Sequence, residues 1–74
     1  MRIYYVRYGN FEPEEVRADG LRNLDLAVRV KDYLDDKYHT FMHEIDFVED
    51  GELKYNTFDE WVDSFNKIYY RKEE

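Results

Sequence analysis

The chain lacks several residues on which common activities depend. It has no Cys and a single Ser, Ser64, so it offers no disulfide, no thiolate metal site and no serine–histidine pattern for nucleophilic catalysis. Its three glycines are isolated, which excludes a glycine-rich phosphate loop. His39 and His43 are the only histidines, and on an extended strand residues four apart are separated by about 13 Å, too far to share one metal ion. We therefore expect no enzyme activity, no cofactor and no metal site.

Long apolar runs are also missing. No run approaches the about 20 residues of a membrane-spanning helix, and the N-terminal residues do not form the apolar core of a signal peptide. The length of 74 residues indicates one domain over residues 1–74, and a domain of this size has little core to stabilise it. Eight Tyr, five Phe and one Trp are the available compensation. We expect one compact domain in the cytoplasm that does not bind membranes.

Turn signals and hydrophobic periodicity divide the chain into six expected elements. Gly9-Asn10 and Asp50-Gly51 are turn dipeptides, and the second is the usual hairpin signature. The residues Thr57 to Glu60 form a capping box that predicts a helix start, whereas Asp19 or Asn23 can cap the earlier helix. The expected elements are strands over 3–8 and 11–18, a helix over 21–38, strands over 40–48 and 53–56, and a helix from residue 57 onward. This order, ββαββα, predicts an α+β fold with a four-stranded, mostly antiparallel sheet and two helices packed on one face.

The first strand has apolar or aromatic residues on both of its faces. If Ile3 and Tyr5 point into the core, then Tyr4, Val6 and Tyr8 lie outside it. These three residues are then the candidate interface of a homodimer. A dimer would also give a small domain additional apolar burial.

Negative charge is concentrated in one part of the sequence. The net charge is −7, and residues 32–63 hold eleven carboxylates against two cations, whereas the residues before and after this stretch are each slightly positive. Such a field repels nucleic acid and attracts basic partners, although a net charge of this size also serves solubility alone. The candidate partner-binding residues are Asp32, Asp35, Asp36, Glu44, Asp46, Glu49, Asp50, Glu52, Asp59 and Asp63.

In size, absence of Cys, α+β pattern and acidic stretch, the chain resembles the small acidic inhibitors that phages and mobile elements encode. The resemblance implies a DNA mimic that occupies the basic, nucleic-acid-binding surface of a host protein, in the host cytoplasm if the chain is phage-encoded. The alternative is a small homodimeric interaction or adaptor domain, antitoxin-like, whose acidity serves solubility. Neither hypothesis includes direct binding of nucleic acid.

Overall fold

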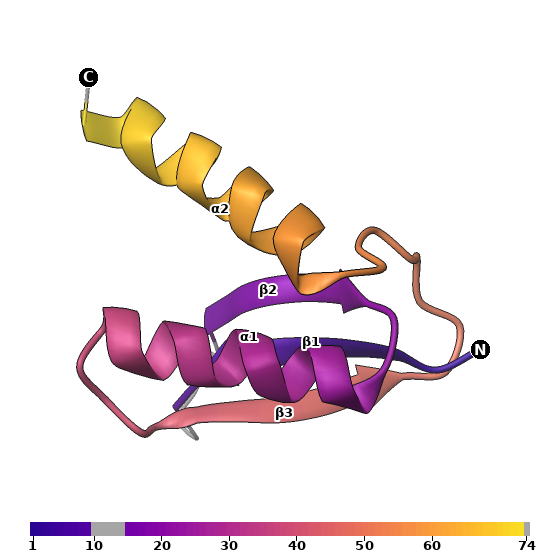
Figure 1. Cartoon of the computed structure of the whole chain (residues 1–74). Coiled ribbons are helices and arrows are strands. Elements are labelled where there is room, and N and C mark those ends of the chain that lie inside the picture. Colours follow the sequence, from indigo (N-terminus) through magenta and orange to yellow (C-terminus); the bar gives the residue numbers. More distant parts are fainter. Residues whose placement is uncertain (10–14, 74) are drawn as a thin grey trace.

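The chain folds into a three-stranded antiparallel sheet with two helices (Figure 1). This computed structural model describes residues 1–9 and 15–73, and side chains as far as residue 68. The elements are β1 (Ile3–Tyr8), β2 (Glu15–Leu21), α1 (Leu24–Lys37), β3 (His43–Val48) and α2 (Phe58–Glu73). The strand order is β2-β1-β3, so β1 is central and pairs with antiparallel neighbours on both sides. The α+β class is therefore confirmed.

Both helices begin at a cap that the sequence offered, but α1 starts at Leu24 and not at the expected residue 21, because Asn23 is its cap and the alternative, Asp19, lies in β2. The Asn23 side chain accepts a hydrogen bond from the Leu26 N–H at 2.9 Å, which starts α1. At α2 the Thr57 hydroxyl accepts the Glu60 N–H at 3.2 Å, and the Glu60 carboxylate reaches back to the Asn56 N–H at 3.3 Å. Each cap satisfies backbone donors that have no partner within the helix, so short local patterns fix both starting points.

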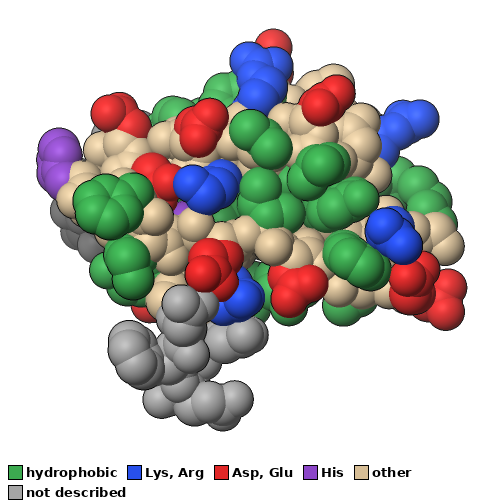
Figure 2. All heavy atoms as spheres, turned by 90° about the horizontal axis from the view of Figure 1, so that it is seen from below, with side chains coloured by type: hydrophobic (Ala, Val, Ile, Leu, Met, Phe, Trp, Pro, Cys, Tyr) green, Lys and Arg blue, Asp and Glu red, His purple; other side chains and the backbone are tan. Residues whose placement is uncertain are grey.

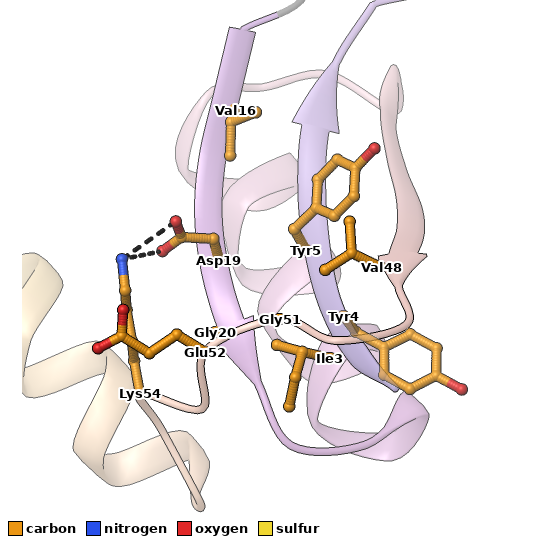
Figure 3. A pocket seen from close by; sticks show the side chains of 10 residues that line it. All are labelled: Ile3, Tyr4, Tyr5, Val16, Asp19, Gly20, Val48, Gly51, Glu52 and Lys54. Carbon is orange, nitrogen blue, oxygen red and sulfur yellow. Dashed lines mark hydrogen bonds and ion pairs between the residues drawn. The ribbon is translucent and has the colours of Figure 1, made fainter. Parts of the chain in front are cut away.

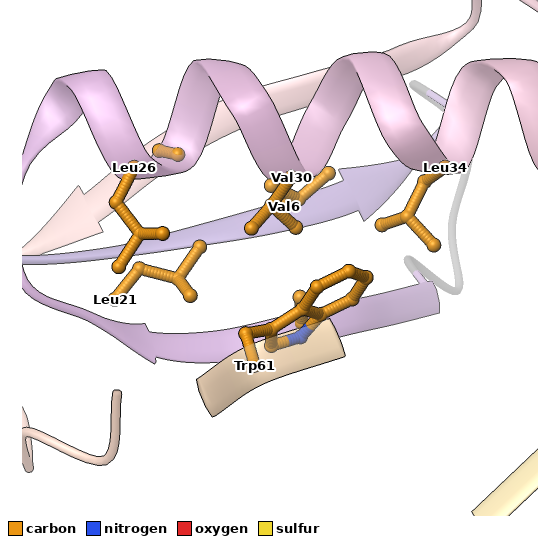
Figure 4. Packing of buried hydrophobic residues seen from close by; sticks show 8 residues of the cluster. Val6, Leu21, Leu26, Val30, Leu34 and Trp61 are labelled. Carbon is orange, nitrogen blue, oxygen red and sulfur yellow. The ribbon is translucent and has the colours of Figure 1, made fainter. Parts of the chain in front are cut away.

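The core lies between α1, the sheet and the first turns of α2 (Figure 4). Its fully buried side chains include Val6 of β1, Leu21 of β2 and Leu34 of α1. Trp61 of α2 is 3% exposed and meets the Tyr33 ring of α1 edge-on, with the ring centroids 5.5 Å apart. Among the side chains that the structure describes, the stripe of α2 is packed against the core as far as Phe65, whereas Ile68 is exposed, and Figure 1 shows the later turns of this helix running away from the sheet.

The prediction of a fourth strand over residues 53–56 was wrong for the part of the chain that the structure describes. After a turn at residues 49–50 the chain does not return along β3. It crosses to the far edge of the sheet, where only an isolated parallel bridge joins Tyr55 to Leu21. The N–H groups of Lys54 and Tyr55 both donate to the Gly20 carbonyl at 2.9 Å. The physical reason is burial, because this path brings Tyr55 and α2 beside α1 and β2, where their rings join the core. The order is therefore ββαβα, and residues 10–14 of the expected second strand lie outside the described residues.

The predicted facing of β1 was wrong for Tyr4 and Val6, although Ile3 is buried as expected. Val6 is fully buried in the core beneath α1, and Tyr4 is packed against the same cluster. Tyr8 shares their face, where its ring meets His43, and is 36% exposed. Both faces of this strand are apolar in sequence, so its own pattern could not choose between them. The interface proposed from Tyr4, Val6 and Tyr8 is therefore largely occupied by the core of the same chain.

Candidate functional site

Cations from the N-terminal part of the chain lie against the acidic stretch. Arg7 forms an ion pair with Glu44 at 2.6 Å between β1 and β3. Arg2 lies 3.6 Å from Glu49, and the terminal amine lies 3.8 Å from Asp50. Antiparallel pairing of β1 with β3 causes this, because it places basic residues of the first strand opposite acidic residues of the third. The charge segregation in the sequence is therefore partly cancelled in three dimensions.

The ten candidate acids fall into two groups. Glu44, Glu49 and Asp50 have the partners just described, Asp35 pairs with Lys31, and Asp63 pairs with Lys67 one turn along α2. The remaining candidates have no ion pair among the described residues: Asp32, Asp36, Asp46, Glu52 and Asp59. Asp25, which the sequence interpretation did not select, is likewise exposed on α1 without an ion pair. None of these six carboxylates forms an ion pair among the described residues.

Asp35 belongs to an internal polar cluster. Its side chain is only 13% exposed and lies 2.7 Å from Lys31 Nζ and 2.7 Å from His43 Nδ1. Burial alone would raise the pKa of Asp35, but hydrogen bonds from Lys31 and His43 outweigh it and hold the pKa below its ordinary value. The Asp35 carboxylate therefore links α1 to the start of β3 through hydrogen bonds. We exclude Asp35 from the surface that can bind a partner.

His43 is buried, which the sequence interpretation missed. It is 1% exposed, its ring lies 5.1 Å from the Tyr8 ring, and its Nε2 atom has no hydrogen-bond partner among the described residues. The Tyr38 ring lies 5.9 Å away and is covered by Arg17 at 4.0 Å. The alternation over residues 40–48 placed His43 on the same face as Ile45, so the signal for its burial was present in the sequence.

The outer edge of β3 is open among the described residues. β3 is a terminal strand of the sheet and pairs only with β1. The Phe47 N–H donates to the neighbouring Asp46 carboxylate at 2.8 Å, and the His43 N–H donates to Asp35 at 3.3 Å, so both point away from β1. Alternate residues of a strand direct their N–H groups to the same side, so the Ile45 N–H also points to this edge. Unpaired main-chain groups of this kind form a template for another strand.

An apolar strip runs beside the open edge, between α1 and β3. We define it by Leu24, Val28, Ile45 and Phe47. Leu24 is 50% exposed, Val28 41% and Phe47 39%. Helical spacing puts Leu24 and Val28 on the same side of α1 as Asp35, which contacts the start of β3, so they lie beside the later residues of the strand. Figure 2 shows apolar side chains gathered on this face, with both acidic and basic groups among and around them, and Arg2 lies 4.2 Å over the Phe47 ring.

Acidic residues border this strip along α1, and the Asp46 carboxylate lies at the outer edge of β3, where it accepts the Phe47 N–H. Asp25, Asp32 and Asp36 are exposed on α1 at spacings of about one and two turns, on the flank next to Val28. On β3 the register places Glu44 and Asp46 on the opposite face of the sheet from the strip, opposite Arg7 and Tyr5. We call Asp25, Asp32, Asp36 and Asp46 the acidic rim. The rim, the strip and the open edge of β3 together form the candidate site.

A depression separate from the candidate site lies on the sheet face away from α1 (Figure 3). It has a volume of about 360 Å³, and its apolar lining includes Ile3, Val16 and Val48. At its border Lys54 lies 3.1 Å from Asp19, and the hydrogen bond from the ammonium group to this carboxylate raises the pKa of Lys54. Val16 and Val48 are each about half exposed, so this is a shallow surface feature with no nucleophile–base arrangement.

Within residues 1–9 and 15–73, no three His, Asp or Glu side chains are grouped so that they could hold a metal ion. In the same ranges no helix has the length and apolar character required to cross a membrane. No family model matches the chain, and neither a curated protein nor a solved structure shows significant similarity to it. Functional inference therefore rests on the site itself.

Proposed function

We propose that the protein is an acidic protein-binding domain that engages a basic partner through the surface between α1 and β3. The observation that carries this proposal is the juxtaposition of three features at one place: an exposed apolar strip, an open strand edge and carboxylates without ion pairs. Apolar contacts supply affinity, whereas the surrounding charge supplies orientation and a fast association rate. Acidity that served only solubility would not need to border an apolar strip.

A DNA-mimicking inhibitor is one form of this proposal, in which the basic site of the partner is the site that binds nucleic acid. The exposed carboxylates of α1 support this form. Asp32 and Asp36 are about 6 Å apart along the helix axis, and Asp25 lies about 10 Å before Asp32. The ion pairs at Glu44 and Glu49 act against it, because they shorten the continuous row of free charges.

The test compares two sets of charge reversals with the same change in net charge. The first set replaces rim residues by Lys at Asp32, Asp36 and Asp46. The control set replaces Glu52, Asp59 and Asp63 by Lys; these are exposed residues of the acidic stretch over residues 32–63 that lie outside the rim. Each immobilised variant, and the wild-type protein, is used to capture proteins from a lysate of the source cells, and circular dichroism verifies that each variant is folded.

We expect the wild-type protein and the control set to capture the same basic protein, and the rim set to lose it. Capture should also be lost at about 1 M salt, where charges are screened beyond about 3 Å. Equal loss in both sets would show that only net charge matters, and undiminished capture by the rim set would contradict the proposed surface. Addition of duplex DNA then tests whether the protein is a DNA mimic, because DNA must displace a DNA mimic from the captured partner.

A further inference from the structure

We infer that the open edge of β3 binds its partner by strand addition, taking an extended segment in which basic and apolar residues alternate. This inference rests on the proposed function and specifies how the same surface recognises its partner. Strand addition uses main-chain hydrogen bonds for affinity and alternate side chains for specificity. The described part of β3 meets both requirements, as its hydrogen bonds and its side-chain pattern show.

The edge offers its main-chain groups in a defined register. The Ile45 N–H points outward and has no side-chain acceptor among the described residues, whereas the Phe47 N–H is held by the Asp46 carboxylate. The Asp46 carboxylate occupies the position that a carbonyl oxygen of an added strand would take. It belongs to a residue adjacent in sequence, so its displacement requires only a side-chain rotation. The third outward donor, the His43 N–H, donates to Asp35, whose carboxylate also accepts a hydrogen bond from Lys31. The accessible part of the edge therefore runs from Ile45 to Val48.

The two faces of an added strand would contact different kinds of side chain. On the side of α1 its residues would lie over the apolar strip, next to Phe47 and Val28, which are 39% and 41% exposed. On the other side its residues would lie beside Asp46, which displacement from the Phe47 N–H leaves free to accept a cation. Because successive residues of a strand point to opposite faces, the complementary sequence alternates apolar residues with Lys or Arg.

A second copy of this chain fits the edge less well. Antiparallel pairing of β3 with itself would bring Asp46 of both copies onto one face of the joined sheet, where Asp46 has no ion pair among the described residues, whereas Arg7 compensates Glu44. Like charges placed opposite one another on neighbouring strands are destabilising. Among the described strands β1 alone lacks acids, and both of its edges are already paired, with β2 and with β3. The charge pattern of the edge therefore selects a basic segment of another protein.

The test uses four synthetic peptides of strand length, each half Lys and half Val. In the first peptide the residues alternate. In the second the same residues are arranged in blocks. The third and fourth are the alternating peptide with backbone N-methyl groups on one or the other set of alternate residues. Only one of these two loses the N–H groups that would donate to the edge of β3. Binding is measured by NMR titration of the labelled protein, together with amide hydrogen exchange at Ile45 and Phe47.

We expect the alternating peptide to bind, to slow amide exchange at Ile45 and Phe47, and to weaken about tenfold or more when main-chain hydrogen bonds are blocked. The block peptide should bind more weakly and should not protect these amides. Equal affinity of all peptides, lost in the rim charge-reversal set, would overturn strand addition while leaving the proposed basic partner intact. If none of the peptides binds, strand addition is overturned. The proposed function is tested separately, and it is overturned if the rim charge-reversal set still captures the partner. Sedimentation showing a dimer that the alternating peptide cannot dissociate would assign the edge to a second copy and would also overturn the inference.

Discussion

Replacement of Asp35 by Asn tests whether its carboxylate joins α1 to β3. The carboxylate accepts hydrogen bonds from Lys31 Nζ at 2.7 Å, from His43 Nδ1 at 2.7 Å and from the His43 N–H at 3.3 Å. Hydrogen bonds to charged groups contribute about 1.5–3 kcal/mol each when they are sheltered from solvent. Asn retains one acceptor oxygen, and the Lys31 side chain is 30% exposed, so that contact contributes less. We expect D35N to lose about 2 kcal/mol of unfolding free energy at neutral pH, a lowering of Tm by roughly 8–16 °C in a domain of this size.

The pH dependence of this loss has a definite sign. The pKa of Asp35 is lower in the folded protein than in the unfolded chain, so folding favours the ionised carboxylate. Its contribution is complete above the unfolded-state pKa of about 4 and is lost as the pH falls through the lower folded-state pKa. The stability difference between the wild-type protein and D35N should therefore be largest near neutrality and shrink below about pH 4.

Urea unfolding followed by the fluorescence of Trp61 provides the assay, because this only Trp is buried. The matched control is Asp36→Asn, which removes one carboxylate from the next residue of α1, where it is exposed and has no ion pair among the described residues. D36N should change the unfolding free energy by no more than about 0.5 kcal/mol. The reasoning is refuted if D35N is as stable as D36N at neutral pH, or if its deficit stays constant down to low pH.

Two further predictions concern packing. Trp61→Ala should cost about 3–5 kcal/mol and largely unfold the domain by far-UV circular dichroism, whereas Phe41→Ala, at a side chain 87% exposed, should have almost no effect; similar melting curves for the two variants would place Trp61 outside the core. Gly20→Ala should destabilise more than Gly9→Ala in urea unfolding, although both residues have positive φ and each substitution carries the left-handed cost of about 1–2 kcal/mol. Only at Gly20 would the added Cβ come within 2.5 Å of Lys54, so the reverse order would contradict the path of residues 53–56.

Local patterns in the sequence predicted the parts of the fold that local interactions determine. The Thr57–Glu60 capping box was sufficient to place the start of α2, whereas for α1 the sequence left two possible caps, and the structure uses Asn23 and begins the helix three residues later than expected. The α+β class followed from the same patterns. In contrast, Asp50-Gly51 carries a hairpin signature, yet Gly51 lies where a Cβ would come within 2.8 Å of Ile3, so its small size allows a close crossing over the sheet. The path after this turn depends on contacts with distant residues that no local pattern encodes.

The candidate site was predictable only in part. The sequence indicated a structured acidic surface, and it correctly placed Glu44 and Asp46 on one face of their strand. It could not show that the cations of β1 would pair with part of that surface, because the pairing of β1 with β3 is non-local. The open edge of β3 was hidden for the same reason, since the expected fourth strand would have covered it. Asp25 was missed because it lies outside the acidic stretch in sequence but on the same flank of α1 as Asp32.

The central claim is that the basic partner binds between α1 and β3, and mapping of the contact surface tests it most directly. The isotopically labelled protein is titrated with the captured partner or with its basic segment, and amide chemical-shift changes are recorded for every assigned residue. The account predicts the largest changes in residues 24–28 of α1 and 45–48 of β3, with little change in α2. Changes concentrated in α2, or around Val16 and Lys54 on the opposite face of the sheet, would contradict it.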